Sequence, residues 1–317
     1  MDSVARHTTG KWRFGWPSLR RMLSLLPLLT GCRALPALAQ DLPALGNENP
    51  TPTQQQEVHR RTVGLIVGGS AAIAAYGRTH WWKDGFDGRF KTANEGWFGQ
   101  DAYTGGADKA GHAYFTYLSG RLLARAFEWA GNDAEHARNL GVWTSLGTMT
   151  AVELIDAYSR RWSFSREDAL MNVAGAGLAY LIEQKPELDR LIDFRLQYKP
   201  SADARHLNRF DPAGDHSGQT YLFVAKASGV PRLQNHPMLR YLELAAGYGS
   251  RGYEPDLHGE RSRHVYFGIS LNLSEVLRQT AYRGNVEPSR TQRFTETVFE
   301  YFQVPGTAAL SDHRLSQ

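Results

Sequence analysis

Polar residues recur at helical spacing in three otherwise apolar stretches of the sequence. They are Asp108, Lys109 and His112 in the first stretch, Glu153 and Asp156 in the second, and Asp168 and Asn172 in the third. Spacings of three and four place each group on one face of a helix. If those faces converge, the interior of a helical bundle holds groups that bind a divalent metal or carry acid–base chemistry.

Two overlapping sets of candidates follow from this pattern. The candidate catalytic residues are Glu153, Asp156, His112 and Lys109, and the candidate metal ligands are Asp108, His112, Glu153, Asp156, Asp168 and Asn172. Glu153 lies in an apolar run without a basic residue at i+4, so burial would raise its pKa unless the fold supplies a partner. We expect that partner to be His112 or Lys109.

Each residue of the cluster also has a purely structural interpretation. Asp108 can cap a helix, Ser165 and Asp168 can form a capping box, Asp156 can pair with Arg160, His112 can be a hydrogen-bonded core histidine, and Asn172 can bond a backbone carbonyl. Under this interpretation the cluster is a buried network that specifies the fold.

Other catalytic signatures are missing from the sequence. It contains no G-x-S-x-G, H-E-x-x-H, P-loop or paired E-x-x-H motif, and its single Cys is the N-terminal Cys32. Serine, cysteine and zincin chemistries are therefore disfavoured. A divalent metal is the only cofactor that the residues suggest.

Composition and charge narrow the class of protein further. The 317 residues are 42% hydrophobic and 21% charged, which is typical of a folded chain, and one Cys excludes a disulfide framework. Residues 1–31 hold five basic residues against Asp2, so removing them leaves 31 basic and 31 acidic residues. The net charge of +4 therefore belongs to a targeting segment, and we expect no nucleic-acid partner.

The N-terminus is typical of a secretory signal. After Arg20-Arg21 comes a short apolar run that ends in Leu29-Thr30-Gly31-Cys32, which resembles a bacterial lipobox. That resemblance implies that 1–31 is a signal peptide and that Cys32 is acylated. The alternative is a plain signal peptidase site at Ala37-Leu38-Ala39, with secretion to the periplasm. Residues 32–56 then form a flexible tether rich in Pro, Asn and Gln.

Hydrophobic periodicity predicts an α+β fold. The predicted helices cover about 57–77, 109–130, 134–159 and 166–184, with a short one at 187–196 and a closing one at 290–303. The predicted strands cover 219–228, 238–248 and 264–273, and the tail 305–317 is expected to be frayed. Residues 57–200 thus form a helical bundle domain, and 201–317 a β-strand region with a closing helix, its small antiparallel sheet packed on the bundle.

The helix within 57–77 has about 15 apolar or small residues between two arginines, short of the roughly 20 that span a bilayer. A buried core helix is the first expectation, with membrane insertion of 62–76 as the alternative. The aromatic-rich segment 78–107 is expected to be a long ordered loop.

The cluster also carries a family resemblance. The segments ADKAGHAYFTYLSG, AVELIDAYS and WSFSREDALMNVAGAGLAY resemble a group of predicted bacterial periplasmic lipoproteins of unknown function, and more distantly the VanZ-like helical membrane proteins. The resemblance covers about 105–182 and implies a periplasmic location without naming a reaction.

The sequence therefore predicts a cell-envelope lipoprotein, held at the outer membrane through acylated Cys32, with a structural or binding role. The expected partners are membrane lipid and an envelope protein or glycan. The alternative is a metal- or carboxylate-dependent enzyme that acts on envelope lipid or glycan through the polar cluster.

Overall fold

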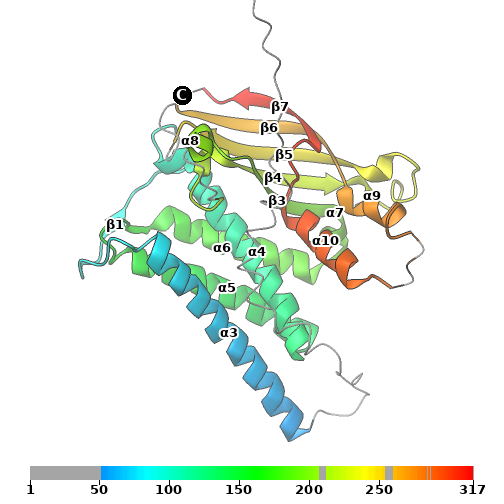
Figure 1. Cartoon of the computed structure of the whole chain (residues 1–317), viewed down its shortest axis with the longest axis horizontal. Helices are drawn as coiled ribbons and strands as arrows, with labels where there is room; N and C mark the ends of the chain where they lie inside the picture. Colours follow the sequence, from blue (N-terminus) through cyan, green and yellow to red (C-terminus); the bar gives the residue numbers. More distant parts are fainter. Residues whose placement is uncertain (1–50, 207–211, 254–259, 284, 286, 317) are drawn as a thin grey trace, which may run out of the picture. The chain divides into compact units, whose positions relative to one another are not determined.

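The computed structural model describes residues 51–206, 212–253, 260–283, 285 and 287–316 (Figure 1). Residues from 55 onward belong to one structural unit. The predicted signal peptide, Cys32 and the tether up to residue 50 lie outside the described residues. The architecture is α+β, as predicted: long helices come first along the chain and an antiparallel sheet follows.

Four long helices form the first half of the described chain. They are α3 (Pro52–His80), α4 (Ala107–Ala130), α5 (Ala134–Asp156) and α6 (Arg166–Gln184). Helix α4 ends at Gly131, which adopts the left-handed conformation that favours glycine, and the Asp133 side chain caps α5. The three predicted helices at 109–130, 134–159 and 166–184 are therefore confirmed. Helix α3 includes the last residues of the predicted tether, and the expectation of a buried core helix at 57–77 is wrong, because the buried residues of α3 are Thr62 and Gly77 while Val63 and Val67 are exposed. No helix in the described part of the chain is both long and apolar enough to cross a bilayer.

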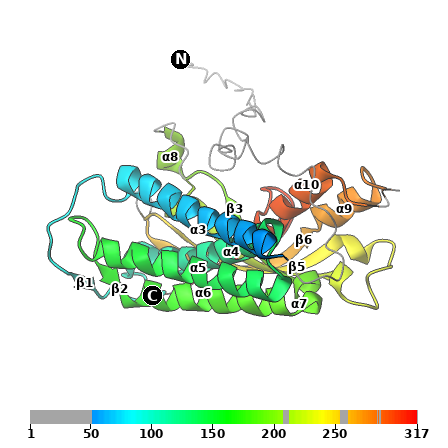
Figure 2. The same ribbon diagram turned by 90° about the horizontal axis from the view of Figure 1, so that it is seen from below.

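Glycines allow α4, α5 and α6 to pack closely (Figure 2). A Cβ added to Gly175 of α6 would lie 2.1 Å from the backbone oxygen of Ala113 in α4. A Cβ added to Gly141 of α5 would lie 2.5 Å from the backbone nitrogen of Ala124. The close approach brings the polar faces of the three helices to the same place.

The sheet of the second half has five antiparallel strands in sequence order. They are β3 (Ile192–Tyr198), β4 (Gln219–Lys226), β5 (Leu242–Arg251), β6 (Ser262–Leu271) and β7 (Ala308–Arg314). The shorter elements are η2 (Tyr103–Gly106), α7 (Pro186–Leu191), α8 (Ala202–His206), η3 (His216–Gly218), η4 (Ala227–Gly229), η5 (Leu239–Tyr241), α9 (Leu273–Gln279) and α10 (Arg290–Tyr301). Strands β1 (Thr92–Ala93) and β2 (Phe164–Ser165) form a separate parallel pair.

Two predictions about these elements are wrong. Residues 192–196 form a strand, because Phe194 and Leu196 alternate with Asp193 and Arg195, which are paired with other charges inside the protein. The tail expected to fray forms β7, whose polar and exposed side chains are typical of an edge strand. Neither segment was predicted as a strand, because charged residues interrupt the alternation of apolar and polar side chains that is typical of strands.

The aromatic core joins the helices to the sheet. Tyr114 and Tyr117 of α4 contact Phe194, and the Tyr114 hydroxyl donates to the Tyr301 backbone oxygen at 2.7 Å. Buried Arg121 of α4 pairs with Glu183 of α6, Asp189 of α7 and Glu300 of α10. One guanidinium therefore links four helices.

The packing predicts opposite effects for two glycines of one helix. Gly175→Ala should lower the free energy of unfolding by about 2 kcal/mol, because its methyl group overlaps the α4 backbone. Gly177→Ala should be neutral or stabilise by up to about 1 kcal/mol, since nothing lies within 4 Å of the added Cβ and Ala favours helices. Urea unfolding of the two variants checks this; equal effects would contradict the packing.

Candidate functional site

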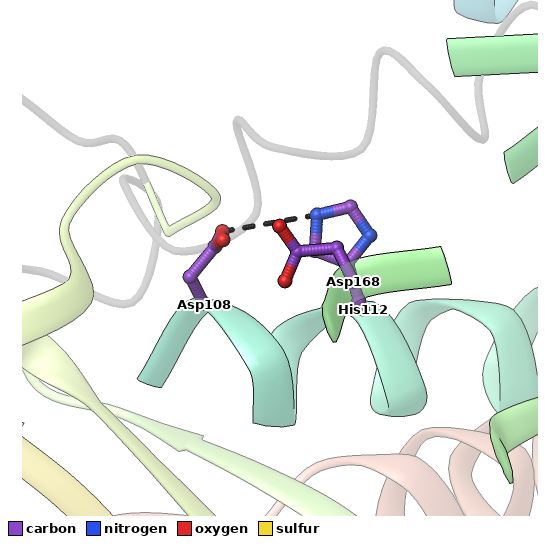
Figure 3. Close-up of side chains that lie close together, drawn as sticks. All are labelled: Asp108, His112 and Asp168. Carbon is purple, nitrogen blue, oxygen red and sulfur yellow. Dashed lines mark ion pairs between the residues drawn. The ribbon is translucent and has the colours of Figure 1, made fainter. Parts of the chain in front are cut away.

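The polar faces of the three helices do converge. The first turns of α4 and α6 meet the last turn of α5, and the aromatic-rich loop at 81–106 lies beside them. Figure 3 shows Asp108, His112 and Asp168, which approach one another from α4 and α6. One ligand atom from each of these three residues lies within 4.8 Å of the other two. Asp168 is buried, while Asp108 and His112 are partly accessible.

The His112 ring is held from both sides. Its Nδ1 lies 3.1 Å from the Asn172 side-chain oxygen and 3.6 Å from Glu153 Oε1. Its Nε2 lies 3.8 Å from Asp108 Oδ1. Hydrogen bonding at Nδ1 leaves Nε2 directed towards the carboxylates, as in a metal-binding histidine oriented by a second residue.

Glu153 receives its partner from α4, as the sequence requires. The partner is His112, and Glu153 Oε2 also accepts the Ser165 backbone N–H at 3.3 Å. Lys109 instead pairs with Glu95, its Nζ lying 2.6 Å from Glu95 Oε2 and 3.4 Å from Asp168 Oδ1. Of the two partners predicted for Glu153, the structure therefore selects His112.

The structural interpretations of the cluster have mixed outcomes. Ser165 caps α6, its hydroxyl accepting the Asp168 backbone N–H at 3.2 Å, but the predicted capping box is only half formed, because the Ser165 backbone N–H donates to Glu153 instead. Asp108 does not cap α4: Gly106 is the N-cap residue, and the Asp108 backbone N–H donates to Thr104. Within the described residues, Asp156 forms no ion pair with Arg160 and instead accepts the Trp82 indole N–H at 2.5 Å.

The helix dipoles stabilise some of the carboxylates and destabilise others. Asp108 and Asp168 lie in first turns, where the helix dipole favours negative charge. Glu153 and Asp156 lie in the last turn of α5, where the dipole disfavours it. Burial raises the pKa of Glu153 to about 8 against the opposing charge of His112, and raises the pKa of Asp156 to about 6.

Negative charge is in excess at this site. Five carboxyl groups, those of Glu95, Asp108, Glu153, Asp156 and Asp168, share two basic side chains, those of Lys109 and His112. Burial opposes the charged form of His112, but the carboxylates of Asp108, Asp168 and Glu153 outweigh it and raise the pKa of His112 to about 9. The cluster therefore retains protons, or it accepts a further cation.

Two buried polar atoms have unused hydrogen-bonding capacity. Asp168 Oδ1 and Asn172 Nδ2 have no hydrogen-bond partner among the described residues, although both side chains are almost fully buried. Leaving such groups unpaired costs about 1–3 kcal/mol each. Asp168 Oδ1 does have an ion-pair partner, because Lys109 Nζ lies 3.4 Å away, but it can still accept a hydrogen bond or bind a cation beside His112 and Asp108.

Sequence reasoning missed two contributors, Glu95 and Trp82, because both lie outside the periodic segments. Glu95 pairs with Lys109, and Trp82 orients Asp156. Buried Lys109 was the available signal for Glu95, since a buried ammonium requires a carboxylate partner.

The fold and the site define a class: an α+β protein whose helices enclose a cluster of carboxylates around one histidine. Residues 94–184 match the model of a family described as predicted periplasmic lipoprotein (DUF2279). This segment contains α4, α5, α6 and all the polar cluster except Trp82, and the match supports a periplasmic lipoprotein. No curated protein and no solved structure matches the chain. The VanZ-like resemblance stays a prediction.

The raised pKa values of His112 and Glu153 predict that the metal-free protein loses stability as pH rises. His112 has a raised pKa, so its contribution is complete below about 6.5 and is lost as pH approaches 9. Glu153 acts in the same direction between about 4.5 and 8, because the folded protein binds its proton more tightly. We expect the free energy of unfolding to fall by on the order of 2 kcal/mol between pH 6 and pH 9.

Urea unfolding in the presence of EDTA measures this dependence. Glu153→Gln removes one titrating group and keeps the side-chain shape, so its profile should be flatter than that of the unchanged protein. Identical pH profiles for the two proteins would contradict the assignment.

Proposed function

We propose that this protein is an envelope lipoprotein that binds a divalent cation inside its helical half. The observation that carries the proposal is the convergence of Asp108, His112 and Asp168 within 4.8 Å, in a cluster with excess negative charge. Asp168 Oδ1 gives further support, because within the described residues it accepts no hydrogen bond and has only the ion pair with Lys109 Nζ at 3.4 Å.

The chemistry of the donors limits the choice of cation. Two carboxylates and one imidazole suit Mn²⁺, Fe²⁺ or Zn²⁺ better than a soft, thiolate-preferring metal. Asn172 and Glu153 lie on the Nδ1 side of the His112 ring, away from the cation. Asn172 would orient the ring through its hydrogen bond, and Glu153 would compensate positive charge on it. Binding at Nε2 displaces a proton from His112, so cation affinity should increase with pH.

Calorimetric titration with Mn²⁺ and Zn²⁺ tests the proposal. We expect one equivalent to bind, and we expect His112→Gln and Asp168→Asn each to weaken binding at least about tenfold by removing a ligand. His264→Gln is the matched control, because His264 lies 2.5 Å from Asp312 in a different part of the structure. Absence of binding to the unchanged protein, or equal loss in the control, would refute the site.

A catalytic role is the second candidate, favoured by Glu153. A carboxyl group with a pKa of about 8, 3.6 Å from an imidazole, is suited to acting as a general base near neutral pH. The substrate class that fits the compartment is envelope lipid or glycan. Loss of hydrolysis in Glu153→Gln with retained cation binding would favour this role over cation binding alone.

The anchoring part of the proposal concerns Cys32. Its support is the lipobox-like Leu29-Thr30-Gly31-Cys32 together with the family match, and we place the anchor in the outer membrane. The alternative remains cleavage after Ala39 and release into the periplasm.

Mass spectrometry of the mature N-terminus distinguishes the two routes. We expect a diacylated or triacylated Cys32 as the first residue, and we expect Cys32→Ser to abolish this modification. A mature chain that begins at unmodified Gln40 would contradict lipid anchoring.

A further inference from the structure

One face of the sheet is apolar and exposed across three neighbouring strands. It continues the face on which Phe194 packs against Tyr114 of α4, because Phe223 pairs and stacks with Phe194. Phe223 of β4, Leu244 of β5 and Phe267, Ile269 and Leu271 of β6 are between 42% and 68% exposed. The register places Phe223, Ala246 and Phe267 in one row, and Ala225, Leu244 and Ile269 in the next. These five large residues and the alanines between them form what we call the apolar sheet face.

This face is unusual because the strands are already buried on their other side. Leu222 and Val224 of β4 and Ala245 of β5 form a buried cluster opposite it. A sheet with one solvated face normally alternates apolar and polar residues. Here the solvated positions are apolar as well, and they surround a shallow hollow of about 650 Å³. Monomeric proteins seldom expose a continuous apolar patch of this kind without a binding role.

We infer that the apolar sheet face docks on the lipid bilayer. None of its five large side chains carries a hydrogen-bond donor or acceptor, whereas interfaces between proteins have about one hydrogen bond per 100–200 Å². Strands β4, β5 and β6 each pair with a neighbour on both sides, so their backbone groups are satisfied without water. Polar side chains begin at β7, where Ser311 and His313 border the face.

The N-terminal segment makes this contact reachable, and here the inference rests on the proposed function. Eighteen residues separate Cys32 from Thr51, the first described residue. An extended chain of that length reaches on the order of 60 Å. A lipid at Cys32 therefore holds the folded unit within reach of the bilayer, where even a weak lipid-binding face remains engaged through its high effective concentration.

Vesicle flotation with a protein that cannot be acylated tests the inference separately from the anchor. The mature chain from position 32 with Cys32→Ser should float with phosphatidylethanolamine and phosphatidylglycerol vesicles. Leu244→Glu and Phe267→Glu, in the same background, should reduce the bound fraction at least about tenfold, because each places a charge on the apolar sheet face.

Phe294→Glu on α10 is the matched control, since Phe294 is exposed to a similar degree outside the sheet, and it should float like the parent. Circular dichroism and urea unfolding must show that all variants fold, and Leu244→Ser provides a milder change if a glutamate does not. Failure of the parent to float, or equal flotation of Leu244→Glu, overturns the inference. So does a stable dimer in light scattering that the same substitutions dissociate, because the face would then be covered by a second copy.

Acylation of Cys32 is measured on the unchanged protein, and cation binding on the Cys32→Ser parent used for flotation. Loss of either, with flotation intact, refutes the proposed function and leaves the lipid-binding face standing. Loss of flotation with acylation and cation binding intact refutes only the lipid-binding role of the apolar sheet face.

Discussion

Compensation of buried negative charge is the constraint on which the helical half depends. Carboxyl groups from α4, α5, α6 and the preceding loop meet where, among the described residues, Lys109 and His112 balance them. Two of these carboxylates gain from helix N-termini, and two are placed at a helix C-terminus, where burial raises their pKa values. The close packing enabled by Gly141 and Gly175 concentrates this charge, so tight helix contacts and an electrostatically demanding interior arise from the same residues.

The same distribution of charge appears in the sheet. Arg195 is buried with Asp193 and Glu243, while Phe223 and Phe267 face outward. In the helices, Lys109 and Asp168 are inside, whereas Trp143 and Leu170 are exposed. Both halves thus bury ion pairs beside an apolar core and also expose some large apolar side chains.

Periodic features of the sequence were predictable and non-periodic ones were not. The three helices that carry Asp108, Glu153 and Asp168 follow from apolar spacing, and the Ser165 cap follows from its distance to Asp168. Glu95 and Trp82 could not be placed, because a loop has no period from which to infer direction. The strand at 192–198 was predicted in part as helix because buried Asp193 and Arg195 resemble surface positions until their partners on distant strands are known. The residues of the polar cluster can thus be predicted from their spacing within each helix. The residues that pair with their charges cannot, because they lie far away in the sequence.

Arg121 shows that the boundary of the family match is not a boundary of the folded protein. Of its three carboxylate partners, Glu183 lies within residues 94–184, while Asp189 and Glu300 lie beyond them. A relative that shares only the matched segment would leave this buried guanidinium with one carboxylate. In such a relative a buried arginine at this position would need other carboxylate partners, so we expect Arg121 to be kept together with the sheet and α10 and to be replaced without them.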